Sequence, residues 1–157
     1  MPACDETFKQ VLLELFDETF HEVHGNYLDR GTSLFETLRP VPAPVASQPV
    51  SASCANLAAQ VDHVRYYLDV LEQYVAGTPP VAVDWGQSWR IGAVDEIEWA
   101  RLKQELESSY QRLRAMIEGI ENWSVGDRLN GAINALVHSA YHLGEIRQAL
   151  CTLVQER

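Results

Sequence analysis

Two histidines four residues apart, His138 and His142, have the residue type and the spacing to bind a metal ion. An α-helix turns once in about 3.6 residues, so side chains four apart lie on the same face. Two imidazoles placed in this way can bind one divalent ion at metal–nitrogen distances of about 2.0–2.1 Å. Such an ion needs at least one more protein ligand. His63, one of five histidines in the chain, lies in a second stretch with helical periodicity. The chemistry therefore depends on whether these three residues meet.

Four long stretches have apolar residues at the three- and four-residue spacing of amphipathic helices. They span about residues 5–24, 53–75, 94–120 and 125–154. Gly25 and Gly77 are natural ends for the first and second stretches. No segment alternates with the two-residue period of a half-buried strand. We therefore predict an all-α fold, a four-helix bundle with a long first crossover connection, formed as a single domain by residues 1–157.

The connections differ in length and in composition. Residues 39–52 hold four prolines and are predicted to be irregular. A short helix is predicted just before them, with Thr32 or Ser33 as its N-cap. Residues 77–92 form a second long loop. Residues 121–124 form a short connection, which predicts that the third and fourth helices lie side by side and antiparallel.

The three histidines are predicted to lie at the edges of the apolar stripes. At about 100° per residue, His142 lies about a quarter turn from the centre of its stripe, and His138 lies further along the same flank. His63 lies about a quarter turn from the centre of its own stripe. We expect the imidazoles to line a groove at the edge of the helical core, open to a substrate. The alternative interpretation is that they are ordinary surface histidines.

The charge and the termini limit the classes of function. The chain has 12 Lys and Arg against 22 Asp and Glu, a net charge of −10. This acidity argues against nucleic acid and against anionic membranes as partners. No apolar run has the length of a membrane span, and the N-terminus lacks the pattern of a signal peptide, so we expect a cytoplasmic protein. Cys4, Cys54 and Cys151 are odd in number and widely spaced, which predicts reduced thiols with structural roles.

Two segments together resemble one known family. His63 lies within Leu57–Leu68, and the later run reads His138-Ser-Ala-Tyr-His142-Leu-Gly-Glu-Ile-Arg-Gln148. This resembles the DinB-like (DinB/YfiT) four-helix proteins, which have one histidine on the second helix and an H-x-x-x-H pair on the fourth. In that family a Gly-x-Ile-Arg/Gln stretch follows the pair. The resemblance covers nearly the whole chain, and it implies that His63, His138 and His142 are the three metal ligands.

The resemblance also implies a class of function. Family members look like proteins that bind a divalent metal ion, with zinc or nickel expected here. Some relatives transfer low-molecular-weight thiols to electrophiles, or isomerise small acids with a thiol cofactor, and many have no known activity. A metal-dependent enzyme acting on a small-molecule substrate, as a homodimer, is therefore expected. The alternative is a non-catalytic metal-binding or dimerising helical bundle.

Three neutral imidazoles leave a bound ion with its full double charge and an open coordination position, which is typical of catalytic sites. Zinc held in this way lowers the pKa of bound water to about 7. It can equally bind a thiol and hold it as the more nucleophilic thiolate. Imidazole ligands also suit nickel, copper and iron, so the residues do not select the metal.

Several neighbouring polar residues have open roles, and no catalytic residue is assigned. Glu145 lies on the face of the histidine pair and could orient a ligand, act as a base, or be solvated. Asn134 lies one turn before His138 and could support a ligand or lie at the surface. The spacing is not H-E-x-x-H, so the built-in glutamate of zinc peptidases is missing. Tyr67 and Tyr141 could reach the groove, although packing is the usual role of such aromatics.

Two further groups have both a functional and a structural interpretation. Trp85 and Trp89 lie in the second long loop and could form a lid or a substrate wall, or a cluster that caps one end of the bundle. His21 and His24 lie beside Asp17 and Glu18 on the first helix. His21 and His24 could bind a metal ion adventitiously, but we interpret these two histidines as part of a solvated face.

Overall fold

The computed structural model describes residues 2–155, and in this range the chain is helical with no strand. The elements are α1 (Pro2–Phe20), α2 (Leu34–Leu38), α3 (Ala43–Ala46), α4 (Leu57–Ala76), the 3₁₀ helix η1 (Gln87–Trp89), α5 (Glu96–Glu118) and α6 (Arg128–Gln155). The prediction of an all-α fold is confirmed. None of the helices within residues 2–155 is both long enough and apolar enough to cross a membrane.

Short polar side chains fix the starts of three helices. Ser33 caps α2, and Glu36 closes the capping box, so Ser33 rather than Thr32 is the cap. Asn56 caps α4 by accepting a hydrogen bond from the backbone N–H of Ala59. This helix therefore begins at Leu57, later than the predicted start near residue 53. Asp95 forms the same kind of capping box in α5.

The helix ends depend on glycine and on a buried carboxylate. Gly77 ends α4 with a φ of 80°, a left-handed conformation that glycine adopts at little cost, and the predicted end is confirmed. The first helix ends at Phe20, before the predicted end at His24. The backbone N–H groups of His24, Asn26, Tyr27 and Leu28 turn towards Glu18 instead of continuing the helix.

Residues 43–46 form the short helix α3, although residues 39–52 were predicted to be irregular. Pro42 is the N-cap, and Pro44 follows in the first turn. A proline there does not interrupt the helix, because the first N–H groups of a helix have no intrahelical partner. The prolines therefore limit α3 to one turn without preventing it.

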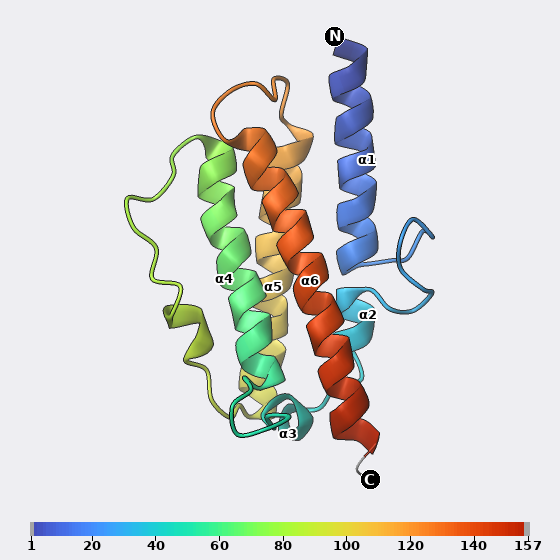
Figure 1. The fold of residues 1–157 in the computed structure, drawn as a ribbon, viewed down its shortest axis with the longest axis vertical. Helices are drawn as coiled ribbons and strands as arrows, with labels where there is room; N and C mark the ends of the chain where they lie inside the picture. Colours follow the sequence, from blue (N-terminus) through green and yellow to red (C-terminus); the bar gives the residue numbers. More distant parts are fainter. Residues whose placement is uncertain (1, 156–157) are drawn as a thin grey trace.

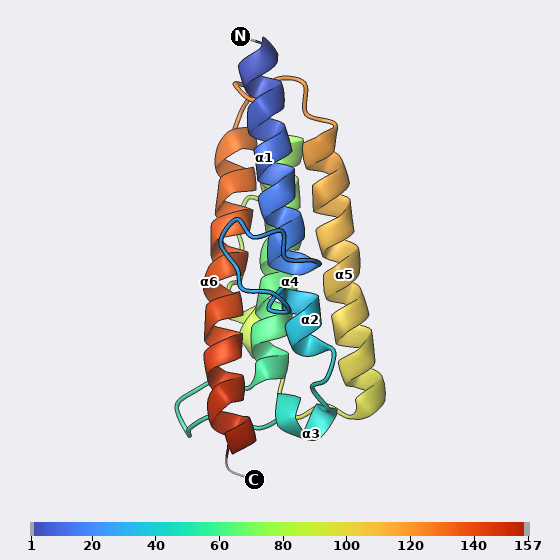
Figure 2. The ribbon, with the colours of Figure 1, turned by 90° about the vertical axis from the view of Figure 1, so that its right-hand side faces the viewer.

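The four long helices α1, α4, α5 and α6 lie alongside one another (Figure 1). α4 contacts both α5 and α6, and α1 contacts the same two helices from the opposite side (Figure 2). α5 and α6 run antiparallel, as predicted, but they lie opposite each other across the core. The prediction that they are neighbours was wrong. Their connection spans residues 119–127, longer than the predicted four residues, and it is long enough to cross the end of the core.

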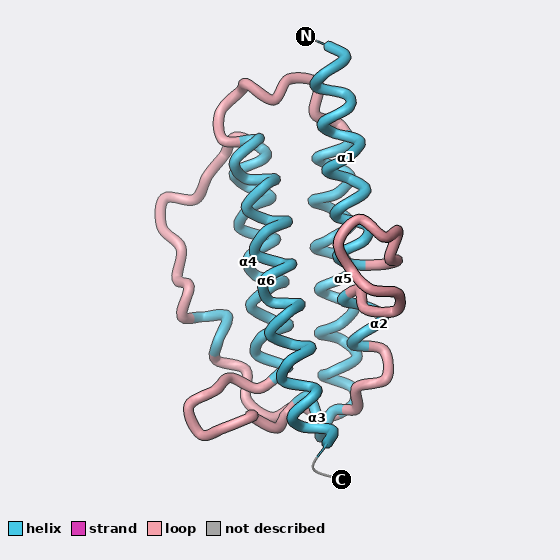
Figure 3. Tube along the Cα trace, turned by 45° about the vertical axis from the view of Figure 1, so that its right-hand side comes forward, coloured by secondary structure: helices cyan, strands magenta, loops and turns pink. Residues whose placement is uncertain are grey.

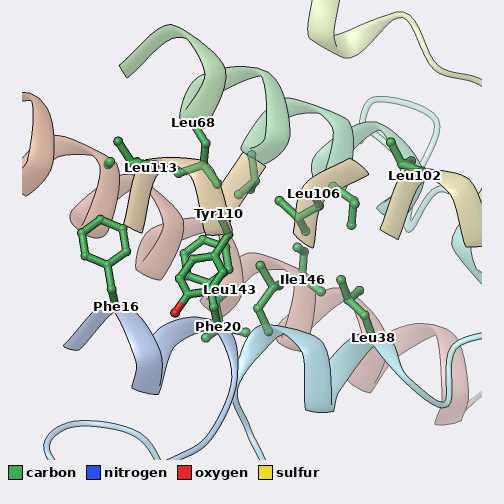
Figure 4. Close-up of a cluster of buried hydrophobic side chains, with 14 of the residues drawn as sticks. Phe16, Phe20, Leu38, Leu68, Leu102, Leu106, Tyr110, Leu113, Leu143 and Ile146 are labelled. Atoms are coloured by element: carbon green, nitrogen blue, oxygen red, sulfur yellow. The ribbon is translucent and has the colours of Figure 1, made fainter. Parts of the chain in front are cut away.

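The core is formed by side chains from all four long helices and from α2 (Figure 4). Phe20 of α1 stacks on Tyr110 of α5 with ring centroids 4.5 Å apart. Leu68 of α4 and Leu143 of α6 complete this layer, and both are fully buried. The long loops lie outside the helices (Figure 3). Apolar burial on this scale is the main contribution to the stability of such a fold.

Small side chains allow α4 and α6 to approach closely. A Cβ atom added at Gly131 of α6 would lie 3.1 Å from a methyl carbon of Val75 in α4. Ala135 and Ser139 follow Gly131 at four-residue spacing and are fully buried. This close approach places the histidines of α6 within reach of the histidine on α4.

Candidate metal centre

The structure brings together His63 from α4 with His138 and His142 from α6. One ring nitrogen from each residue can be chosen so that all three lie within 4.8 Å of one another. Nε2 of His138 lies 3.0 Å from Nε2 of His63. Tetrahedral zinc with bonds of about 2.05 Å requires nitrogen–nitrogen distances of about 3.3 Å. The three nitrogens lie close enough together for the group to hold a metal ion once the rings adjust to this spacing.

Two of the three imidazoles are more deeply buried than the positions on their helices predicted. His63 is 6% exposed and His142 is 4% exposed, whereas His138 is half-buried. The loop of residues 77–95 runs along the outer side of α4 (Figure 1). From this loop Trp89 stacks on the His63 ring with centroids 4.0 Å apart. The predicted open groove is therefore partly closed, because a loop covers the flank of α4.

The hydrogen bonds around His63 determine which ring nitrogen faces the cluster as an acceptor. Nδ1 of His63 lies 2.8 Å from Oγ of Ser88. The single hydroxyl hydrogen of Ser88 is donated to the carbonyl oxygen of Trp85 at 3.0 Å. In the tautomer compatible with that bond, the Ser88 oxygen accepts a hydrogen bond from Nδ1–H of His63. Nε2 of His63 consequently presents its lone pair to the other two histidines, as a metal ligand requires.

The carboxylate of Glu145 lies beside Nδ1 of His142, as Ser88 lies beside Nδ1 of His63. Oε2 of Glu145 lies 2.8 Å from Nδ1 of His142, although the angles are not those of a hydrogen bond. Oε1 of Glu145 accepts a hydrogen bond from the hydroxyl of Tyr141 at 2.6 Å. A carboxylate beside Nδ1 favours a proton on that nitrogen and leaves Nε2 free to bind a metal. Of the roles left open for Glu145, the geometry supports orientation of the histidine.

The electrostatic surroundings favour neutral imidazoles. Burial, together with repulsion from the neighbouring His142, lowers the pKa of His63 to about 4. Burial likewise lowers the pKa of His138 to about 4, with added repulsion from the other two histidines. Burial also lowers the pKa of His142, although Glu145 opposes this effect. All three rings are therefore neutral at pH 7, which is the form that binds metals.

Aromatic rings surround the cluster. Tyr67 stacks on His138 with centroids 3.6 Å apart, and Trp85 packs against Tyr67 at 5.3 Å. Trp85 and Trp89 are each about 40% exposed. These tryptophans thus lie along the side of α4 and form a wall of the histidine site, rather than capping an end of the fold.

Other polar residues considered from the sequence lie away from the cluster. Nε2 of His24 pairs with Asp17 at 2.6 Å, and Nε2 of His21 lies 2.9 Å from a Glu107 oxygen. The amide of Asn134 donates to Asn130 at the surface. Glu18, the neighbour of His21 and His24, is fully buried.

Sequence reasoning missed two residues near the histidines. Ser88 comes from a loop far along the chain, and a single serine in a loop gives no signal of its role. Gln60 lies three residues before His63, so helical periodicity could have placed it on the same face. Its Oε1 is buried and has no hydrogen-bond partner among the described residues.

Replacing Ser88 with Ala is expected to weaken zinc binding about 10-fold, without changing the number of ions bound. The change removes the acceptor that fixes the His63 ring, and losing such a partner typically costs 10–100-fold in affinity. Competition with a chromophoric chelator would measure the dissociation constant. The control is Ser108→Ala, an exposed serine of α5. An affinity equal to that of the unaltered protein in the Ser88 variant would contradict this role.

Comparison of the chain with protein-family models, with curated proteins and with solved structures finds no match in any of the three. The geometry of the histidine cluster is therefore the basis for a function of this protein.

Proposed function

We propose that the protein binds one divalent metal ion, zinc or nickel, through His63, His138 and His142, and uses it as an enzyme on a small molecule. The observation that carries the proposal is the convergence of one nitrogen from each imidazole within 4.8 Å. Ser88 lies beside Nδ1 of His63 and Glu145 lies beside Nδ1 of His142. Residues that orient the ligands of metal sites have the same position. We further propose that the helices form a four-helix bundle of the DinB-like kind, in a cytoplasmic homodimer.

Transfer of a low-molecular-weight thiol to an electrophile is the reaction that we propose. An ion bound by three neutral ligands keeps its double charge and would stabilise a thiolate, while the thiol proton leaves to solvent. The thiolate sulfur would then form a bond to carbon as the leaving group departs with its electron pair. The role of this chain's residues is to hold the imidazoles neutral and oriented. The aromatic wall of Tyr67, Trp85 and Trp89 would exclude water from one side.

The proposal can be tested with the cobalt-loaded protein. Addition of 2-mercaptoethanol is expected to produce an intense sulfur-to-cobalt absorption band, and an alkyl iodide should then consume the thiol faster than in free solution. The matched control is His24→Ala, which removes a histidine paired with Asp17 away from the cluster. Absence of the absorption band would exclude a thiol at the metal. A band without accelerated alkylation would support metal and thiol binding and would contradict the proposed catalysis.

A non-catalytic dimerising protein is the second candidate. An exposed apolar stripe on α6 favours it, since Leu129, Ile133, Val137 and Tyr141 lie four residues apart and are each 39–60% exposed. Residues at this spacing share one helix face, and such a face suits a helical partner. The stripe ends beside the histidine cluster, so dimerisation and metal binding are compatible on one chain.

A further inference from the structure

We propose that a groove beside the histidine cluster binds a small molecule that carries a protonated amine on an apolar body. The groove has a volume of about 500 Å³, within the range of small-molecule sites. It lies between the first turns of α4 and the second half of α6, with residues 50–55 at its rim. Glu145 lines it and also lies beside His142, so the groove adjoins the histidine cluster.

The charge of the groove selects for a cation. Glu145 is the single charged side chain among the described residues that line it, and no Lys, Arg or His is present there. Each carboxylate oxygen of Glu145 has one neighbour, Tyr141 for Oε1 and His142 for Oε2. A carboxylate oxygen has more than one lone pair, so Glu145 can accept a further hydrogen bond. An anionic ligand would find no partner for its charge and would be repelled by Glu145.

A second acceptor lies near the inner side of the groove. Gln60 lines the groove, and its Oε1 is buried without a hydrogen-bond partner. A buried polar atom of this kind normally has a partner. The Gln60 side chain must turn towards the groove before this oxygen can accept a hydrogen bond from a ligand, because the atom has almost no exposed surface. A carboxylate with other side-chain oxygens nearby and no cationic side chain fits an ammonium group, which carries three N–H donors and no acceptor. Val50, Ala55 and Ala149 supply the apolar wall against which the body of the ligand would pack.

Gly144 keeps the floor of the groove open. It lies inside α6, where glycine lowers helix stability relative to alanine. A Cβ atom added there would meet no other atom within 4 Å, so no close packing explains the glycine. A side chain at this position would extend into the groove that Gly144 lines. The glycine thus leaves room for a ligand in the groove, whereas the packing of the helices does not require it.

The inference does not depend on a bound ion, and it can be tested on the metal-free protein with three molecules of similar shape. Nuclear magnetic resonance titrations would follow the backbone amides of Gly144 and Ala149 with benzylamine, benzyl alcohol and benzoate. We expect benzylamine to bind at least tenfold more tightly than benzyl alcohol, and benzoate not to bind. Equal affinities for benzylamine and benzoate would overturn the inference. A chelator in the buffer keeps the protein free of metal. The result is therefore independent of whether the protein is a metalloenzyme.

Two variants distinguish benzylamine binding in the groove from non-specific attraction to an acidic chain. Gly144→Leu should weaken benzylamine binding at least tenfold by filling the groove. Glu145→Gln should bring benzylamine and benzyl alcohol within threefold of each other. The control, Glu118→Gln, removes an exposed carboxylate of α5 and should leave binding unchanged. An equal loss in Glu118→Gln and Glu145→Gln would show non-specific attraction and would refute the proposal.

Cys54 gives a second measurement in case Gly144→Leu does not fold. Cys54 lines the groove and is exposed. In a chain with Cys4→Ser and Cys151→Ser, saturating benzylamine should slow the alkylation of Cys54 by iodoacetamide at least threefold. Benzoate at the same concentration should leave the rate unchanged. Equal rates with and without benzylamine would contradict the inference.

Discussion

Replacing His138 with Ala is expected to abolish stoichiometric zinc binding. The change removes one of three converging nitrogens, so the affinity should fall by more than the 10–100-fold that supporting partners typically account for. The unaltered protein should retain one zinc ion per chain after dialysis, measured by mass spectrometry of the metal. The variant should retain only a trace.

Thermal unfolding provides an independent measure of the same site. A ligand that binds only the folded state stabilises it by about 2.7 kcal/mol when present at 100 times its dissociation constant. Zinc should therefore raise the unfolding temperature of the unaltered protein and not that of His138→Ala. The control His24→Ala should behave like the unaltered protein, because His24 pairs with Asp17 away from the cluster. One retained zinc ion per chain in His138→Ala would refute the three-histidine site.

Replacing Glu18 with Gln is expected to destabilise the fold by about 3 kcal/mol, because charge-assisted hydrogen bonds in a buried site are lost. The Glu18 carboxylate accepts hydrogen bonds from the backbone N–H groups of His24, Asn26, Tyr27 and Leu28 and from the Asn26 side chain, at 2.7–3.1 Å. In Gln an NH₂ group would face N–H donors in place of one oxygen. Urea unfolding would measure the loss, with the exposed Glu22→Gln as the control. A loss below about 0.5 kcal/mol would contradict this role, because that is the usual range for surface substitutions.

The contribution of the Glu18 carboxylate should also be visible in the pH dependence of stability. Burial alone would raise the pKa of Glu18, but the hydrogen bonds from residues 26–28 outweigh it and lower the pKa from 4.5 to about 2. A carboxylate with a lowered pKa stabilises the fold above the pKa of the unfolded chain. That contribution is lost as the pH falls from about 4.5 towards 2. The Gln variant should lack this part of the acid-induced loss, and an identical acid profile in both proteins would count against the assignment.

Helix type and the boundaries of α5, with the C-terminal ends of α4 and α6, followed from the sequence to within two residues, because they depend on local interactions. Apolar periodicity placed the four long helices, short polar residues predicted a cap at Thr32 or Ser33, and Gly77 ended α4 in the left-handed conformation. The start of α4 was predicted too early, because the local cap at Asn56 was not recognised. The end of α1 was set by backbone groups that turn to the Glu18 carboxylate, which no periodicity reveals.

The sequence by itself determined that His138 and His142 share a face and that His63 lies on another helix, because helical geometry fixes the direction of side chains. Only the tertiary structure decided that the three rings meet, since this requires the close approach of α4 and α6 at Gly131. It also decided that Ser88 and Trp89 close over His63 and that α5 lies opposite α6. These features arise from contacts between segments far apart in the chain, and local patterns carry no record of such contacts.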